Sequence, residues 1–239
     1  YYPDALQMSI KITFSPADGK LLGAQIVGYS GVDKRIDEFS QVIKHSGTVY
    51  DLMALEQAYA PPFSSAKDPV AVTGYVAGNI LNGKMQPLYW RELQAADWSK
   101  VTLVDVRTPD EFALGALKGA VNIPLDDMRD RMKEIPRDKP VYLYCGVGLR
   151  GYLASNILLQ NGYQEVKNLI GGLKLYKAAT TPLPEPKEFS NSGSSSSDSS
   201  KVDHSEHSKD SAEAYTIASS VIPSMRAIKV DACGISCPG

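Results

Sequence analysis

The chain has 239 residues, of which 43% are hydrophobic and 22% charged, values that are ordinary for a globular protein of one or two domains. A formal net charge of −2 gives no basic surface of the kind that binds nucleic acid. No apolar run approaches the roughly 18 residues that a membrane span needs, and no signal peptide opens the sequence. Because the three cysteines lack the spacing of a disulfide framework, we expect a cytoplasmic protein without a membrane partner.

Residues 1–85 are expected to form an α+β unit. Apolar and polar residues alternate from Met8 to Phe14, which predicts a strand with one buried face, and Asp18-Gly19 predicts a hairpin turn after it. Thr48, alone or with Asp51, is a candidate helix cap, and Pro69 is typical of a first helical turn. The sequence predicts strands at 8–14 and 21–29 and helices at 36–45, 52–57 and 70–81.

Four stretches of this segment carry a family resemblance: Tyr1-Tyr2-Pro3, 23–28, 32–37 and, above all, 58–69. Together they resemble the dimerisation domain of the FAD-dependent pyridine nucleotide-disulfide oxidoreductases, in the branch of the coenzyme A-disulfide and CoA-persulfide (polysulfide) reductases. The resemblance implies a homodimer formed through residues 1–85, with FAD and NAD(P)H as cofactors of the full-length protein and CoA as a candidate substrate. It also implies that the flavin-binding motif and the reducing cysteine lie upstream of Tyr1, so that we expect this chain to be a fragment.

Two tyrosines of this segment match a functional position of that branch. By the resemblance, Tyr59 and Tyr1, with Tyr2 as a shift of one, reach the reducing cysteine of the partner subunit, where a phenol hydrogen-bonds a thiolate or the substrate sulfur. From the residues alone, both remain open to a simpler interpretation as half-buried aromatic side chains.

Residues 86–180 alternate between strand-like and helix-like patterns, which predicts an α/β domain with a mainly parallel sheet. Thr108 is a candidate cap followed by Pro109 and, three residues on, Glu111. In such a sheet the functional site lies at the carboxyl ends of the strands, where Asp105, Arg107 and Cys145 are placed. The sequence predicts strands at 101–106, 119–124, 141–144 and 166–169, helices from 108, over 125–135 and after the loop 145–151, and a last turn at 171–173.

Cys145 lies where the apolar strand 141–144 turns into a helix that Asn161-Gly162 ends. Backbone N–H groups of such a turn point inward, and the helix dipole adds partial positive charge. This environment favours the thiolate form of a cysteine, and glycines allow the loop to wrap closely around a small anion. Arg150 either holds the loop or neutralises what it binds.

Five motifs of this segment combine: Asp105-Val106-Arg107, Glu111-Phe112, Gly119-Ala120-x-Asn122-Ile123-Pro124, Cys145-x4-Arg150 and Gly171-Gly172. Together they resemble a single rhodanese domain, whose activity is sulfur transfer through a cysteine persulfide. The resemblance implies Cys145 as the nucleophile. It implies a substrate-binding cradle of Gly146, Val147, Gly148, Leu149 and Arg150. It leaves open whether Asp105, Arg107 and Arg150 contact an anion or form a salt-bridge network that holds the loop.

Two departures from the rhodanese pattern bear on the sulfur donor. Gly115-Ala116-Leu117 stands where a histidine-containing motif is frequent, and Arg150 is the single basic residue of the loop. A weakly cationic loop disfavours thiosulfate as the sulfur donor and favours a bulkier thiol persulfide as the donor.

Two other function classes remain open. Cysteine phosphatases use a Cys-x5-Arg loop, whereas the spacing from Cys145 to Arg150 is one residue shorter and suits a single terminal sulfur. A non-catalytic dimerisation and docking module with an inactive rhodanese fold is the second alternative, against which the intact Cys145 argues.

The tail divides into a linker and a cysteine-containing end. Residues 181–214 are rich in Ser and predict a disordered linker, in which His204 and His207 are expected to be solvated rather than metal ligands. Residues 227–232 predict a strand, and the following Cys233 to Gly239 resembles the opening of a TusA-type sulfur carrier. That resemblance implies 215–239 as a truncated carrier domain with Cys237 as its functional cysteine. A redox pair or half of a metal site formed by the two cysteines stays open.

The three resemblances agree on sulfur chemistry. We therefore expect a sulfurtransferase in which Cys145 forms a persulfide and passes sulfane sulfur to a thiol. The expected partners are small-molecule thiols or persulfides, the flavin site, and sulfur carriers including Cys237, which a flexible linker would bring close. We expect no metal.

Overall fold

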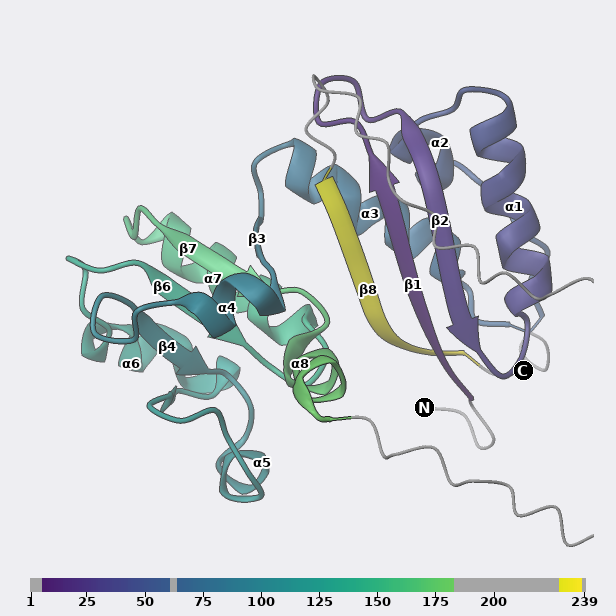
Figure 1. Cartoon of the computed structure of the whole chain (residues 1–239). Coiled ribbons are helices and arrows are strands. Elements are labelled where there is room, and N and C mark those ends of the chain that lie inside the picture. Colours follow the sequence, from purple (N-terminus) through teal and green to yellow (C-terminus); the bar gives the residue numbers. More distant parts are fainter. Residues whose placement is uncertain (1–5, 61–63, 183–227, 238–239) are drawn as a thin grey trace, which may run out of the picture. The chain divides into compact units, whose positions relative to one another are not determined.

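The computed structural model describes residues 6–60, 64–182 and 228–237, which contain two β-sheets with their helices (Figure 1). One sheet is antiparallel with the strand order β2-β1-β8, and the other is parallel with the order β3-β7-β6-β4-β5. The expected α/β fold class, with its mainly parallel second sheet, is confirmed.

The antiparallel sheet is built on β1, whose alternation of apolar and polar residues buries one face. Met8, Ile10, Ile12 and Phe14 are all buried, and the polar residues between them are not. The elements of this part are β1 (Leu6–Phe14), β2 (Leu21–Gly28), α1 (Val32–Lys44), α2 (Val49–Met53), α3 (Pro69–Leu81) and β8 (Ile228–Cys237).

The helix predicted at 52–57 is wrong, because α2 spans Val49–Met53 instead. Thr48 and Asp51 do form a capping box: the Asp51 carboxylate accepts from the Thr48 amide at 2.6 Å. A helix that is capped at Thr48 begins at the next residue, so the prediction set the start of the helix one turn too late. Residues 55–60 then have no regular structure.

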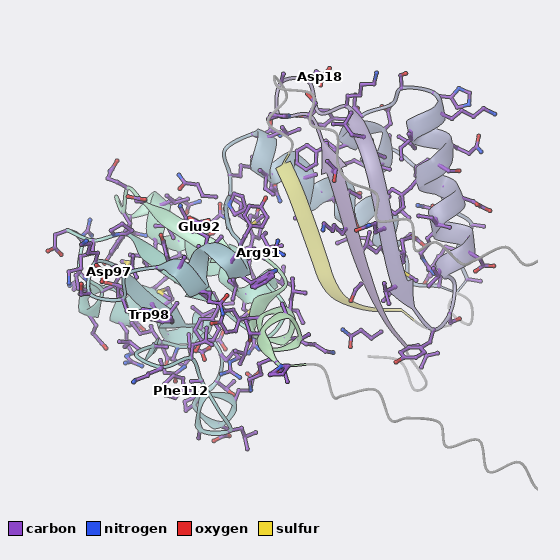
Figure 2. The ribbon with its side chains drawn as sticks, viewed as in Figure 1. Asp18, Arg91, Glu92, Asp97, Trp98 and Phe112 are labelled. Carbon is purple, nitrogen blue, oxygen red and sulfur yellow. The ribbon has the colours of Figure 1, made fainter. Side chains whose placement is uncertain are left out.

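The parallel sheet carries the second set of elements, and its strands are close to those predicted. They are β3 (Gln86–Leu88), β4 (Thr102–Asp105), β5 (Val121–Asn122), β6 (Val141–Tyr144) and β7 (Val166–Leu169). The helices are α4 (Trp90–Ala95), α5 (Pro109–Ala113), α6 (Met128–Arg131), α7 (Leu149–Gln160) and α8 (Gly172–Thr180), with short 3₁₀ turns at Leu125–Asp127 and Met132–Glu134. Glu92 of α4, labelled in Figure 2, pairs with Lys167 of β7 at 2.6 Å and ties this helix to the sheet.

Strand β6 is buried on both faces, and its alternation sorts its residues between two cores. Val141 and Leu143 face a core that includes Ala154 and Leu158 of α7. Tyr142 and Tyr144 face a different core, with residues of α4 and α8. Because side chains alternate along a strand, Cys145 continues the first row and lies on the α7 side of the sheet.

One prediction for this part is correct in extent but not in helix type, and another is wrong. The helix expected at 125–135 is present as a continuous helical segment over 125–134, but only Met128–Arg131 is α-helical, and the flanking Leu125–Asp127 and Met132–Glu134 are 3₁₀ turns. The Tyr163 hydroxyl donates to the carbonyls of Met132 and Ile135 at the end of this segment. The last turn expected at 171–173 is instead the start of a nine-residue helix, α8.

Several expectations for the ends of the chain lie outside the described residues: Tyr1, the linker, His204 and His207. The strand expected at 227–232 is present as the longer β8, which pairs antiparallel with β1. In the described part of the chain, no helix is long and apolar enough to cross a membrane, and no group of side chains is suited to hold a metal ion.

Candidate active site

Cys145 is the first residue after β6 and precedes the loop that leads into α7. Its side chain is 1% exposed, and its Sγ accepts a hydrogen bond from the Gly148 amide at 3.0 Å. Gly148 has φ +124°, a conformation that residues with a side chain rarely adopt, so the amide reaches the sulfur because this position is glycine. The loop thus presents a backbone donor to a buried thiol at a helix N-terminus, as the sequence predicts.

The cradle residues on either side of Gly148 are open to the surroundings. Val147 is 37% exposed and Leu149 is 66% exposed. A molecule that reaches Cys145 therefore meets apolar side chains from the loop itself.

Arg150 is bound by a carboxylate. Its guanidinium pairs with both oxygens of Glu111, with N–O distances of 2.6 and 2.7 Å. Glu111 lies on α5 beside Phe112, which is labelled in Figure 2, and the same carboxylate accepts the Thr108 amide of the capping box. The loop cation is thus neutralised within the domain.

Each member of this ion pair shifts the pKa of the other. The hydrogen bond from Arg150 lowers the pKa of Glu111 from 4.5 to about 2. The pKa of Arg150 is raised, mainly by Glu111 and to a smaller extent by Cys145. The sequence prediction gave Glu111 a capping role alone and missed that it pairs with the loop arginine, a contact between residues far apart in the chain that capping spacing does not reveal.

Asp105 and Arg107 form a second ion pair at the end of β4, and this one is buried. The shortest distance is 2.7 Å, and the side chains are 0% and 9% exposed. Arg107 also donates to the carbonyl of Gly115, while Asn122 donates to the backbone carbonyls of Asp105 and Arg107. These hydrogen bonds join the end of β4 to the segments that contain Gly115 and Asn122.

The other predicted site residues lie elsewhere in the chain. Tyr59 is in the irregular segment after α2, with its side chain 51% exposed. Cys237 is in β8, opposite Leu6 of β1.

The described residues do not fit a flavin or nicotinamide dinucleotide. Gly146, Gly148 and Gly151 have the spacing of a dinucleotide-binding fingerprint, but β7, the next strand, ends without the acidic residue that would bind a ribose. The side of the loop that faces Gly172 has no room for a ligand, because a Cβ added to Gly172 would lie 2.6 Å from backbone atoms of Cys145, Gly146 and Val147.

Comparison with known proteins finds two family matches, each over one part of the chain. Residues 89–179 match the rhodanese-like domain, and residues 1–70 match the pyridine nucleotide-disulphide oxidoreductase dimerisation domain. A sulfurtransferase of Allochromatium vinosum is 42% identical over 91 residues, covering 38% of this chain and 85% of the relative. A coenzyme A disulfide reductase of Staphylococcus epidermidis is 42% identical over 77 residues, covering 32% of this chain and 18% of the relative.

Two solved structures match most of the chain. The reduced CoADR-RHD protein of Bacillus anthracis is 48% identical with a TM-score of 0.71, covering 74% of this chain and 32% of that protein. The NAD-dependent persulfide reductase of A. fulgidus is 36% identical with a TM-score of 0.65, covering 73% of this chain and 31% of that protein. The chain thus spans about a third of the length of these reductases. It belongs to the rhodanese-like family through residues 89–179, and residues 1–70 before them are similar to the oxidoreductase dimerisation domain.

Proposed function

We propose that this chain is the sulfur-trafficking part of a FAD-dependent CoA-disulfide or persulfide reductase, in which Cys145 carries sulfane sulfur as a persulfide. The observation that carries the proposal is the buried Cys145 Sγ with the Gly148 amide directed at it, in a domain of the rhodanese-like family. The similarity to a sulfurtransferase and to a persulfide reductase supports it.

The proposed step is a redox-neutral exchange. The Cys145 thiolate attacks the terminal sulfur of a donor persulfide, a bond forms between the two sulfurs, and the donor leaves as its own thiolate. The proton of the terminal sulfur stays on that sulfur or is lost to water. An acceptor thiolate then attacks the same sulfur, and Cys145 leaves as thiolate.

The paired state of Arg150 supports the choice of donor. A dianionic donor such as thiosulfate needs a net cationic loop, whereas Glu111 already neutralises this arginine. A thiol persulfide carries at most one charge at its reacting end and needs only the backbone amides. The exposed apolar side chains of Val147 and Leu149 fit a bulky organic thiol.

The remaining parts have proposed roles in the longer protein. The dimerisation domain supports a homodimer, in which Tyr59 and Tyr1 would reach the partner subunit's reducing cysteine near FAD, with NAD(P)H as reductant. Cys237, in a truncated TusA-type carrier segment, would accept sulfur from Cys145. CoA is the candidate thiol of the reductase part.

Mass spectrometry after treatment with a small-thiol persulfide tests the proposal. We expect the Cys145 peptide to gain the mass of one sulfur atom, and the gain to be absent in Cys145→Ser. A bare thiol after several donors would instead favour a non-catalytic docking module. Hydrolysis of phosphate esters that depends on Cys145, without any persulfide, would favour a phosphatase.

A further inference from the structure

The turn at residues 171–172 brings the start of α8 into contact with the backbone of the Cys145 loop. The amide of Leu173 donates to the carbonyl of Cys145 at 2.8 Å. The amide of Lys174 donates to the carbonyl of Gly146 at 3.1 Å. The first turn of α8 therefore holds two successive carbonyls of the loop, and these contacts also satisfy amides that a helix leaves unpaired at its start.

Because the peptide bond is planar, these contacts also fix the direction of the N–H groups of Gly146 and Val147. In a trans peptide the C=O and N–H groups point to opposite sides. The carbonyl of Cys145 shares its peptide with the N–H of Gly146, and the carbonyl of Gly146 shares its peptide with the N–H of Val147. Both N–H groups therefore point away from α8, and neither donates to another of the described residues. The Gly148 amide, on Cys145 Sγ, is the third in this row.

Gly172 is the residue on which this arrangement depends. It has φ +58°, and a Cβ built on it would lie 2.6 Å from the carbonyl oxygens of Cys145 and Gly146 and from the amide nitrogen of Val147. Real Cβ atoms do not approach backbone atoms so closely, so any side chain at this position would push α8 away from the loop.

We propose that Gly172 is a positioning residue for sulfur transfer at Cys145, an inference that rests on the proposed function. Because Gly172 lets α8 hold the two carbonyls, the amides of Gly146 and Val147 stay available for the terminal sulfur anion of the Cys145 persulfide. The unmodified thiolate lacks this second sulfur. The arrangement therefore stabilises the persulfide more than the thiol, although no bond forms or breaks at Gly172.

The test is an equilibrium measurement on the full chain. The protein is equilibrated with a small-thiol persulfide and its thiol, and mass spectrometry gives the ratio of persulfide to thiol at Cys145. We expect Gly172→Ala to lower this ratio about tenfold, the equivalent of one hydrogen bond to a charged acceptor. Gly119→Ala is the matched control: Gly119 has φ +78° but nothing within 4 Å of an added Cβ, so it imposes similar backbone strain without the contact.

A second variant and a wild-type measurement keep the test decisive if Gly172→Ala does not fold. Lys174→Pro removes one of the two amides at an exposed position in the first helical turn, where proline is tolerated. Lys174→Ala keeps the amide and reports the effect of the side chain. In the wild type, persulfide formation should slow hydrogen exchange at the Gly146 and Val147 amides about tenfold, because they become hydrogen-bonded.

The outcomes separate this inference from the proposed function. If the wild type forms no persulfide, the proposed function fails. If the wild type forms one, but folded Gly172→Ala and Lys174→Pro keep the wild-type ratio, Gly172 has no positioning role. Unchanged exchange of the two loop amides on persulfide formation would contradict it in the same way.

Discussion

Arg107 and Arg150 each bind a carboxylate close to Cys145 in the chain or in space, but at different depths. The side chains of Arg107 and Asp105 are 9% and 0% exposed, whereas those of Arg150 and Glu111 are 34% and 38% exposed. Removing one partner of a buried pair leaves an uncompensated charge, while a half-exposed partner is solvated by water. We therefore expect the Asp105–Arg107 pair to maintain the fold and the Glu111–Arg150 pair to set the charge of the loop.

The largest expected effect comes from breaking the buried pair. Arg107→Met leaves Asp105 ionised in the interior, and we expect the free energy of unfolding to fall by about 3–5 kcal/mol. Urea denaturation measures it. Arg129→Met is the control, since Arg129 is exposed and the chemical change is the same. If both variants lower the free energy of unfolding by the same small amount, the buried pair does not maintain the fold.

Replacing each arginine by lysine tests whether the buried pair and the half-exposed pair differ in their contribution to stability. Lysine keeps the charge but cannot form the two-point contact that each guanidinium makes with its carboxylate. We expect Arg107→Lys to lower the free energy of unfolding by about 1–3 kcal/mol and Arg150→Lys by less than about 1 kcal/mol. Equal losses in urea denaturation would show that depth does not distinguish the pairs.

Removing the charge of Glu111 should change reactivity more than stability. Glu111→Gln leaves Arg150 unpaired, so anionic reagents should be favoured at Cys145. We expect the ratio of alkylation rates by iodoacetate and iodoacetamide to rise about threefold to fivefold, the effect of one partly screened charge. The free energy of unfolding should fall by about 0.5–1 kcal/mol.

Glu134→Gln provides the matched control for this change. Glu134 pairs with Arg131 at 2.8 Å, and this pair is also partly exposed. The substitution frees a surface arginine without touching the Cys145 loop. If both glutamine variants raise the alkylation ratio equally, the effect is that of net charge and Glu111 does not set the local charge.

The smallest expected effect is the pH dependence of the half-exposed pair. The folded-state pKa of Glu111 is lowered from 4.5 to about 2 by the hydrogen bond from Arg150. The unfolded chain therefore takes up this proton first, and the contribution is present above about pH 4.5 and is lost as the pH falls towards 2. Because the pair is more than a third exposed, the contribution stays below about 1 kcal/mol.

Urea denaturation of the wild type and Glu111→Gln at neutral pH and at about pH 3 checks this sign. The stability difference between the two proteins should shrink at the lower pH. A difference that stays constant, or grows, would show that Arg150 does not lower the pKa of Glu111.

The local features of the site could be predicted from the sequence. The strand 141–144, the cysteine after it and the helix that follows the loop depend on neighbouring residues alone, and the structure reproduces them, although the helix begins at Leu149, inside the expected loop 145–151. The same holds for the capping box at Thr108 and Glu111, which lies within one turn.

The missed features depend on contacts between distant residues. Glu111 and Arg150 are 39 positions apart, and no local pattern connects them. Residues 171–173 are expected from the sequence to form a turn, but they begin helix α8. The amides of Leu173 and Lys174, at the start of this helix, donate to carbonyls of the distant Cys145 loop. The hydrogen bonds from the Tyr163 hydroxyl to the carbonyls of Met132 and Ile135, about thirty residues away in the chain, are likewise long-range.

Cys145 is proposed to carry sulfane sulfur and to transfer it to an acceptor thiol. The most direct measurement is mass spectrometry of the full chain after a donor persulfide labelled with heavy sulfur, followed by addition of an unlabelled small thiol. We expect the label to appear on Cys145, to leave with the added thiol, and never to appear in Cys145→Ser. Label that is absent from Cys145, or that stays there when the thiol is added, would contradict it.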